Sequence, residues 1–307
     1  MSKISFIYSD NREYNIQRSL SLIKGDIIAG LKKAKKIVVK PNCVVDNFQL
    51  AATHVDALKA VFDFIKPYSK NQITLAEGTG VGDTVEAFKN YDYFSLQETY
   101  GFTVVDLNND EFEVIELIDK NEKVWKAQIS KTVIESDYLI SVSLPKTHNN
   151  VIYTGAVKNV AVGSLLRADE GFVTRVASKF GLGKNNKAMI HQGNWAINEN
   201  IRRLATKINI NLAVLDGFAA MQGNGPATGG EMVPAHWAIS STDALSADIL
   251  ATKLMSINLD EIGYLSMLKE QKKPEEDPFI IGDNWRANIQ KFKLHDNHAR
   301  SKNWQKP

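Results

Sequence analysis

The middle of the chain brings together side chains that commonly carry out acid–base and covalent chemistry. Lys146 and His148 directly follow an apolar run, and Lys158 lies in the segment of small apolar residues that comes next. Burial lowers the pKa of a lysine, so that it can bind an anion or form a Schiff base. Histidine titrates near neutral pH and serves as an acid, a base or a metal ligand. We therefore expect Lys146, His148 and Lys158 to be catalytic residues; the alternative is a solvated loop.

A second histidine, His191, stands shortly before a predicted helix that is capped by Gly193 or Asn194. With His148 it forms a candidate pair of metal ligands, or a proton donor and a proton acceptor. A metal usually takes at least three protein ligands, and His54 is a candidate for the third. At each position the alternative is a histidine that is structural or exposed.

A run of fifteen residues, 216–230, contains five glycines and follows a predicted strand. Glycine allows backbone amides to approach a ligand closely, and successive amides can cradle an anion. The run matches neither the GxGxxG dinucleotide fingerprint nor the Walker motif, so it favours a carboxylate or another anion over a nucleotide. We expect Asp216 to be catalytic. The anion would be bound by Gly223, Asn224 and Gly225, and a long surface turn is the alternative.

Short apolar runs alternate with stretches of helical periodicity along most of the chain. Strands are predicted over residues 3–8, 36–40, 72–76, 102–107, 137–144, 212–215, 238–241 and 279–281. Helices are predicted over residues 15–31, 53–67, 84–100, 195–208, 243–255 and 259–270, and a hairpin over residues 113–129. This alternation predicts an α/β fold with a mainly parallel, doubly wound (Rossmann-like) sheet and helices on both of its faces.

Individual residues mark the ends and breaks of these helices. Gly25 is expected to interrupt the first helix. Thr53 and Asp243 are expected to cap the helices that they precede. Asp248 lies inside an otherwise apolar helix, where an unpaired carboxylate would be costly, so we expect it to have a particular role.

A parallel sheet binds ligands beyond the carboxyl ends of its strands. Polar or glycine-rich turns follow four of the predicted strands, and they contain Lys40, Glu77, Lys146 with His148, and Asp216. We expect these turns to meet at one edge of the sheet and to form a site, although the loops of parallel sheets are polar in any case. The residues expected to bind the substrate there are Lys40, Asn42, Glu77, Thr147 and Asn159.

The composition limits the classes of protein to which the chain can belong. Its 307 residues, 44% of them hydrophobic and 23% charged, suit one large or two medium globular domains. Cys43 is the single cysteine. This excludes a disulfide framework, a Cys-ligated zinc site and a Cys-ligated iron–sulfur cluster formed by this chain alone, and it indicates a reducing compartment. We expect Cys43 to be a small core residue, with a nucleophile as the alternative.

The sequence further predicts a cytoplasmic protein without a membrane span. The first ten residues contain no long apolar segment, and no run approaches the roughly 18 uncharged apolar residues of a spanning helix. The net charge of +2 creates no overall field for a nucleic acid, which we do not expect as a partner.

One continuous domain is expected over residues 1–285, because no change in composition marks a linker. Residues 149–194, rich in Gly, Asn and Lys, are expected to form a lid or a small second lobe. The basic tail, residues 286–307, contains six Lys or Arg and one acidic residue, and its charge of +5 leaves −3 for the rest. We expect a solvated, partly disordered end; the alternative is an anion-binding arm. The aromatic residues that could anchor such an arm are Trp285, Phe292 and Trp304.

Nine short motifs occur in order over residues 36–282: Lys40-Pro41-Asn42, Ala52-Thr53-His54, Glu77-Gly78, Ser136-Asp137-Tyr138-Leu139-Ile140, Leu144-Pro145-Lys146-Thr147-His148, Val157-Lys158-Asn159, His191-Gln192, Asp216-Gly217 and Gly223-Asn224-Gly225-Pro226. This series resembles the domain-of-unknown-function family 362. Members of that family often carry a ferredoxin-like iron–sulfur segment. This chain departs from the pattern because it has Cys43 alone, so an electron-transfer role would require a partner that supplies the cluster.

The order of an acid, a histidine, a lysine and a second histidine is also remotely similar to that of the nickel-pincer lactate racemases. Here the order runs from Asp137 through His148 and Lys158 to His191. In those racemases the lysine tethers the pincer cofactor, one histidine ligates nickel and the other acts as an acid or base. The resemblance therefore implies Lys158 as the tether, His191 as the ligand and His148 as the acid or base.

These observations favour an enzyme that acts on a small carboxylate or another anion by proton or hydride transfer, either a racemase or isomerase or an oxidoreductase. A nickel-pincer-like or other metal cofactor would fit this expectation, and the metal ligands would be His191 and His148. One alternative is a redox or cofactor-assembly partner of an iron–sulfur protein. Another is a module that binds an anionic ligand or nucleic acid through the basic tail. A homodimer is compatible with the sequence, which leaves the oligomeric state open.

Overall fold

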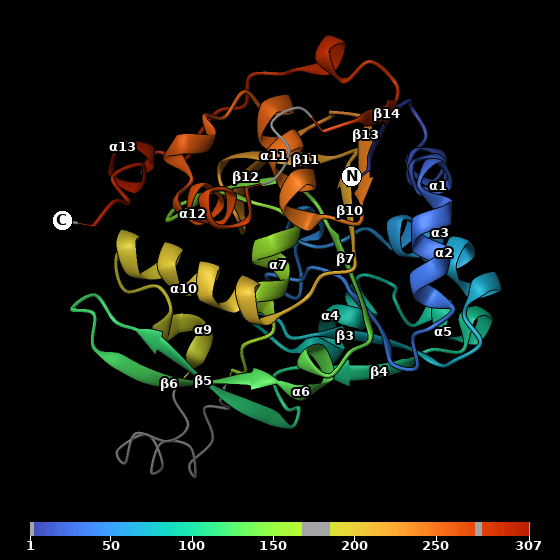
Figure 1. Cartoon of the computed structure of the whole chain (residues 1–307), viewed down its shortest axis with the longest axis horizontal. Helices are drawn as coiled ribbons and strands as arrows, with labels where there is room; N and C mark the ends of the chain where they lie inside the picture. Colours follow the sequence, from blue (N-terminus) through green and yellow to red (C-terminus); the bar gives the residue numbers. More distant parts are fainter. Residues whose placement is uncertain (1–2, 168–184, 274–277, 307) are drawn as a thin grey trace.

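The computed structural model of the chain describes residues 3–167, 185–273 and 278–306. Its centre is an eight-stranded sheet in the order β14-β1-β13-β10-β7-β2-β3-β4 (Figure 1). In that order the strands span Ile280–Gly282, Ile4–Tyr8, Trp237–Ser241, Leu212–Gly217, Tyr138–Ser143, Ile37–Lys40, Ile73–Glu77 and Thr103–Asp106. Within this sheet only β13 runs antiparallel to its neighbours, and the other neighbouring strands are parallel. The mostly parallel sheet and the positions of the predicted strands are confirmed.

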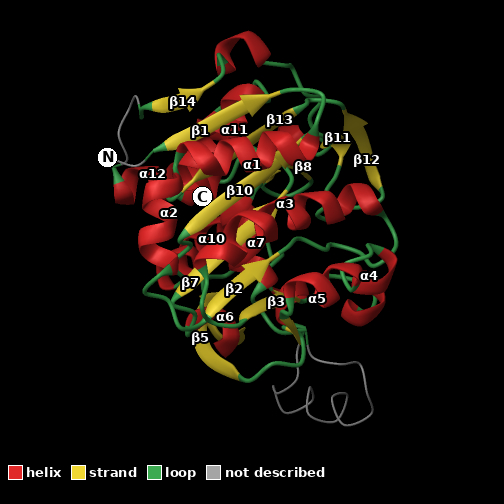
Figure 2. Cartoon of the chain, turned by 90° about the vertical axis from the view of Figure 1, so that its right-hand side faces the viewer, coloured by secondary structure: helices red, strands yellow, loops and turns green. Residues whose placement is uncertain are grey.

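Helices cover both faces of this sheet, each set over its own apolar core (Figure 2). Successive strand residues point to opposite faces, so Val38 joins one core and Val39 the other. The core that contains Val39 is shared by α1 (Arg12–Leu22), α2 (Lys24–Leu31), α3 (Val55–Ile65), α4 (Thr84–Asn90) and α5 (Ser95–Tyr100). The core that contains Val38 is shared by α7 (Ala156–Gly163), α10 (Asn194–Lys207), α11 (Ala244–Leu254) and α12 (Gly263–Lys272). In the described ranges no helix has the length and apolar character needed to cross a membrane.

The topology is a mixed α/β arrangement. A doubly wound, Rossmann-like order is not confirmed, because the antiparallel strand β13 lies between β1 and β10. A second sheet has the order β12-β11-β8-β9, and its strands span Gly229–Val233, Ala220–Asn224, Lys146–His148 and Ile152–Thr154. The predicted hairpin is confirmed as β5 (Phe112–Ile118) paired with β6 (Val124–Ser130).

Several predicted helices are divided by local breaks. The first one ends at Ile23, where φ is −112° and ψ is 18°, rather than at Gly25. The predicted helix 84–100 is interrupted by a turn in which Asp92 has a φ of 60°. Shorter helical turns are η1 (Gln49–Ala51), η2 (Lys66–Tyr68), α6 (Lys131–Ile134), α9 (Asn186–Met189), η3 (Leu259–Glu261), η4 (Trp285–Asn288) and α13 (His298–Ser301).

The helix caps follow the sequence in two of three cases. Asp243 accepts the amides of Leu245 and Ser246 and caps α11, and Gly193 precedes α10, as predicted. The prediction that Thr53 caps α3 is wrong, because the cap is His54. The hydroxyl of Thr53 instead donates to the carbonyl of Val142, 2.7 Å away in the central sheet.

The basic tail packs against the body of the protein. Phe292 and Trp304 are buried, and Trp304 Nε1 donates to the carbonyl of Asp260 at 2.9 Å. Asp296 accepts a hydrogen bond from the side chain of Asn224. Most residues of 286–306 are exposed, as expected for a solvated end, but the expectation of a partly disordered segment is not confirmed, because aromatic anchors hold it against the body.

The predicted lid over residues 149–194 is not confirmed. Its first part forms β9 and α7, and α7 packs against β7, α10 and α11 in the interior. Residues 168–184 lie outside the described part of the chain. Residues 185–194 continue into α9 and the start of α10.

Candidate functional site

A cavity of about 360 Å³ opens at the carboxyl ends of β2 and β3. Its walls come from the turns after these strands, from β8 and β9, from α7 and from the segment around α9. The predicted site residues that line it are Asn42, Glu77, Lys146, His148, Lys158, Asn159 and His191. The structure thus brings together three of the four predicted turns, together with α7 and α9.

The position of β8 decides which of its side chains reach the cavity. β8 follows β7 after a two-residue turn, and its side chains alternate between two faces. Lys146 and His148 line the cavity. Thr147 points to the other side, where its hydroxyl donates to the carbonyl of Gly223 at 2.8 Å. Thr147 therefore holds β8 against β11, and it does not line the cavity.

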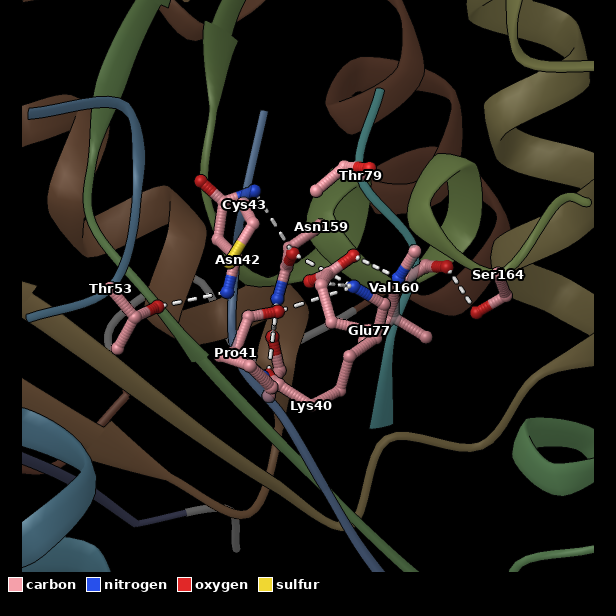
Figure 3. Close-up of polar contacts among 12 residues, drawn as sticks. Lys40, Pro41, Asn42, Cys43, Thr53, Glu77, Thr79, Asn159, Val160 and Ser164 are labelled. Carbon is pink, nitrogen blue, oxygen red and sulfur yellow. Dashed lines mark hydrogen bonds and ion pairs between the residues drawn. The ribbon is translucent and has the colours of Figure 1, made fainter. Parts of the chain in front are cut away.

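Glu77, which lines the cavity, forms a buried ion pair with Lys40, which does not (Figure 3). Lys40 Nζ lies 2.6 Å from Glu77 Oε2, and the two side chains are 0% and 2% exposed. Lys40 also donates to the carbonyl of Pro41 and to Asn159 Oδ1, each at 3.2 Å. The second carboxylate oxygen of Glu77 accepts the amide of Gly78. Lys40 is thereby saturated with acceptors, and it supports the cavity without lining it.

Two further buried lysines have acceptors of their own. Lys146 Nζ donates to Asn42 Oδ1 and to the carbonyl of Ala51. Burial, and after it the charge of Lys158, lowers the pKa of Lys146 to about 7. Lys187 donates to the carbonyl of Gly78 at 2.6 Å and to Asn108 at 2.9 Å. Burial likewise lowers the pKa of Lys187 to about 7.

Lys158 differs from the other lysines of the cavity. It is the third residue of α7 and is 8% exposed. The part of the chain that the structure describes offers its Nζ no hydrogen-bond acceptor. Burial lowers its pKa to about 8, so roughly a tenth of this amine is neutral at pH 7.

His148 and His191 present nearly parallel rings on the cavity, with an interplanar angle of 9° and centroids 6.2 Å apart. His148 Nδ1 accepts the amide of Asn150 at 3.0 Å, which assigns the proton of the neutral ring to Nε2. His191 Nδ1 lies 2.7 Å from the carbonyl of Lys187, which assigns its proton to Nδ1 and leaves a lone pair on Nε2.

Both imidazoles are neutral near pH 7. Burial, followed by the Lys158 charge, lowers the pKa of His148 and of His191, although His191 is the more exposed of the two. The backbone thus prepares one histidine as a proton donor and the other as a proton acceptor.

The glycine-rich run does not form the expected anion cradle. It folds into the hairpin β11–β12, and only Pro226 of this run lines the cavity. The amide of Gly223 donates to the carbonyl of Lys293 at 2.7 Å, and that of Gly225 to the carbonyl of Gly223 at 2.9 Å. The side chain of Asn224 pairs with Asp296. Because these donors are already engaged, Gly223, Asn224 and Gly225 are not placed to hold a ligand in this cavity.

Asp216 is buried but does not line the cavity. Its carboxylate lies 3.1 Å from Arg12 Nε, and it also accepts the amide of Phe218. The Arg12 guanidinium lies above the Phe218 ring. Asp216 therefore joins β10 to the start of α1. Arg12 and Asp216 lie far apart along the chain, so no local sequence pattern predicts this pair.

Lys187 and Asn108 were not predicted as site residues. Lys187 lies one helical turn before His191. This i, i+4 spacing places both side chains on one face of a helix and is the feature of the sequence that could have indicated Lys187. Asn108 follows β4 at the same edge of the sheet and accepts from Lys187. Its position after a parallel strand is the only indication in the sequence.

Metal ligands are sparse in the described ranges, which hold no group of three or more His, Cys, Asp or Glu side chains suited to a metal ion. His54 serves as the α3 cap and does not join His148 and His191. Cys43 lines the cavity but is buried, and burial raises the pKa of its thiol, which suits a core residue rather than a thiolate.

The family model described as "Domain of unknown function (DUF362)" matches residues 37–253. This chain belongs to the DUF362 family. The match includes every residue that lines the cavity, so the cavity of this DUF362 chain lies inside the family domain. No curated protein matches the chain.

Two solved structures show a likeness at low sequence identity. The lactate racemase apoprotein from Thermoanaerobacterium thermosaccharolyticum is 18% identical, with 70% of this chain and 50% of that chain covered and a TM-score of 0.43. A protein from Thermotoga maritima, solved by the Northeast Structural Genomics Consortium, is 17% identical, with 81% and 60% covered and a TM-score of 0.49. The DUF362 chain thus spans about half to three fifths of the length of these two proteins.

Proposed function

We propose that this DUF362 chain is an enzyme that transfers a proton to and from a small anionic substrate, of which a carboxylate is the simplest example. The observation that carries the proposal is the pair of cavity imidazoles with opposite tautomers. His191 Nε2 offers a lone pair and His148 Nε2 offers a proton, each oriented by a backbone hydrogen bond. A base and an acid on one cavity suit racemisation or isomerisation.

The lysines supply the charge that such a substrate needs. Lys146 and Lys158 line the cavity, whereas the Glu77 carboxylate is paired with Lys40. A carboxylate that enters this site would neutralise buried ammonium groups, and water excluded from the cavity would strengthen that attraction. The anion would be held while the histidines act on the neighbouring carbon.

A nickel-pincer cofactor fits the kinds of donor on this cavity. Among the described residues the Lys158 amine has no acceptor and the Nε2 lone pair of His191 has no donor. In that case Lys158 would tether the group and His191 would coordinate its metal. When bound, the cofactor would supply an acceptor for hydride and so extend the chemistry from proton to hydride transfer.

Deuterium wash-in tests the proposed proton transfer. The protein is incubated in D2O with a panel of small 2-hydroxy, 2-amino and 2-oxo acids. NMR follows the loss of the C2 proton signal of the hydroxy and amino acids, and of the C3 proton signal next to the oxo group of the 2-oxo acids. We expect exchange with at least one acid, and at least a hundredfold slower exchange in both His148→Gln and His191→Gln, since proton-transfer groups contribute about 10²–10⁴-fold.

The matched control is His298→Gln, because His298 pairs with Glu261 away from the cavity. We expect this variant to retain the exchange rate of the unmodified protein. The proposal fails if the panel shows no exchange, or if the two cavity variants exchange as fast as the control.

Anion binding is expected to weaken as the pH rises. Burial, and after it the charge of Lys158, lowers the pKa of Lys146 in the folded protein from its ordinary 10.5 to about 7. Lys40 lowers this pKa further, whereas Cys43 and Glu77 raise it. An anion binds the protonated form, so the affinity for oxalate should be steady below pH 7 and fall by up to about tenfold per pH unit above it. Isothermal titration at pH 6 to 9 measures this.

The variant Lys146→Met should bind oxalate more weakly at pH 6 and lose part of the slope. The remaining slope would come from Lys158, whose pKa is about 8. Lys59→Met is the control, because Lys59 pairs with Glu13 on α1 and lies outside the cavity. An affinity that is constant or that rises between pH 6.5 and 9 contradicts a site built on these lysines.

A further inference from the structure

Four buried lysines gather at the carboxyl edge of the sheet, and they differ in what their amines contact. Lys40 has three acceptors, and Lys146 and Lys187 have two each. Lys158 has none among the described residues, although it is only 8% exposed. A buried ammonium without an acceptor is unfavourable, whereas a neutral amine in the same place is tolerated. The surroundings of Lys158 therefore raise the share of the uncharged, nucleophilic amine above that of an ordinary lysine.

From this contrast we propose that Lys158 forms an imine with the substrate, and that the substrate is an anion bearing an aldehyde or ketone carbonyl, such as a 2-oxo acid. This inference rests on the proposed function, since it uses the same cavity and the same two histidines. It adds the substrate class and a covalent step. It also separates the roles of the cavity lysines, because Lys146 would hold the carboxylate while Lys158 reacts.

The position of Lys158 suits this step. It projects from the first turn of α7, which is packed between β7, α10 and α11 and is therefore rigid. His148 and His191 line the same cavity as Lys158. After burial, the charge of Lys158 is the largest cause that lowers the pKa of each histidine. An acid, a base and a nucleophile on one cavity are the elements that imine chemistry requires.

The free amine is also available at neutral pH. With a pKa of about 8, roughly a tenth of Lys158 is unprotonated at pH 7, against about 0.03% for an ordinary lysine of pKa 10.5. On this basis Lys158 should react about two orders of magnitude faster than an average surface lysine of the same intrinsic reactivity.

The step balances as a condensation. The lone pair of Lys158 Nζ attacks the carbonyl carbon and forms a C–N bond, and the carbonyl oxygen leaves as water after taking up two protons, one from the amine and one from the solvent. The product is a protonated imine. Removal of a proton from the adjacent carbon by His191 Nε2 then moves the C–H electron pair into a C=C bond and the C=N pair onto nitrogen, which gives an enamine. Return of this proton from the His191 imidazolium to the carbon re-forms the protonated imine, and its hydrolysis releases the free lysine, the carbonyl compound and one proton.

Reductive trapping tests the proposal. The full-length protein is incubated at pH 7 with pyruvate and cyanoborohydride, which delivers hydride to a protonated imine, and the adduct is located by peptide mass mapping. We expect one dominant adduct, on Lys158, that forms about a hundredfold faster than on any surface lysine. Lys158→Arg keeps a positive charge but cannot form an imine, and it should lose this adduct.

Two controls accompany the trapping. Lys306→Met removes a surface lysine paired with Glu122 and should leave the labelling of Lys158 unchanged. Lactate, an anion without an aldehyde or ketone carbonyl, should give no adduct. Mapping on the unmodified sequence remains decisive if a variant fails to fold.

The proposal is overturned if the adducts spread over surface lysines with Lys158 unlabelled. It is equally overturned if the native protein carries a covalent group on Lys158 already, as a tethered cofactor would require. If no adduct is trapped but deuterium exchange still occurs, the imine proposal is wrong and the proposed proton transfer stands. If Lys158 is labelled but no deuterium exchange occurs, the proposed proton transfer is wrong and the imine proposal stands.

Discussion

Replacing Lys40 with methionine should lower the free energy of unfolding by about 3–5 kcal/mol, because it leaves a buried carboxylate without its cation. Lys40 is 0% exposed and its Nζ lies 2.6 Å from Glu77 Oε2. Methionine has a similar length and fills much of the same space, so the loss is mainly electrostatic. Urea denaturation at pH 7, followed by circular dichroism, measures the change.

A second variant separates the charge from the packing. In Lys40→Met/Glu77→Gln the unpaired carboxylate is gone, so a large part of the stability should return. The Lys40→Met variant alone should become less stable as the pH rises from 5 to 8. Without Lys40, the buried Glu77 has a higher pKa in the folded state than in the unfolded state. The folded state therefore binds the proton more tightly, and the free energy of unfolding falls as the proton is lost with rising pH.

The matched control is Lys59→Met. Lys59 also forms a close ion pair, with Glu13 at 2.6 Å, but the pair lies at the surface. Surface pairs contribute about 0–1 kcal/mol, so this variant should be nearly neutral. Equal effects of Lys40→Met and Lys59→Met would show that burial of the Lys40–Glu77 pair does not matter.

Removal of the Asp248 carboxylate should have the second large effect. Asp248 is 0% exposed on α11 and accepts three hydrogen bonds, from the Tyr153 hydroxyl at 3.0 Å and from the amides of Ala156 and Val157 at 2.8 and 3.0 Å. These amides form the start of α7, so Asp248 caps from another helix the element that carries Lys158. Each buried donor left without a partner costs about 1–3 kcal/mol, so Asp248→Ala should destabilise the protein by roughly 3 kcal/mol or more.

The same change should also disturb the site. With its start uncapped, α7 would hold Lys158 less firmly, so pyruvate labelling of Lys158 should fall in Asp248→Ala even at temperatures where the protein remains folded. Asp243→Ala is the control, because Asp243 caps α11 itself at a less buried position. It should cost about 1 kcal/mol and leave the labelling intact. Unchanged stability and labelling in Asp248→Ala would contradict its role as the cap of α7.

Gly155 shows why this capping arrangement is sterically demanding. A side-chain carbon at this position would approach the Tyr153 hydroxyl and the Asp248 carboxylate within about 2 Å, so glycine alone fits there. The prediction that Asp248 is unusual was correct as far as its burial goes. Its partners could not be predicted, because Tyr153 and Ala156 lie more than ninety residues away along the chain.

Local patterns were sufficient to predict the framework of the site. Strand positions such as those of β2, β3 and β7 follow from short apolar runs, and parallel strands place their carboxyl ends at one edge. For this reason Glu77, Lys146 and His148 were expected together and are found together. The turn that contains Asp216 belongs to the same sheet, but its carboxylate is engaged by Arg12.

Other features depended on contacts that sequence cannot report. The glycine-rich run had the composition of a loop, but its backbone pairs with itself as β11 and β12, which engages the amides that an anion would need. The basic tail had the composition of a mobile end, but Phe292 and Trp304 bury their rings against the body. In both cases distant partners outweighed local propensity.

The sequence by itself determined the α/β framework, the edge of the sheet at which the site lies and the kinds of side chain that could act there, because these depend on local periodicity and on the direction of the strands. Only the tertiary structure decided which lysines have an acceptor among the described residues and which has none there, and which nitrogen of each histidine carries the proton. Those properties depend on the acceptors and donors that surround Lys158, His148 and His191, and folding alone brings these together.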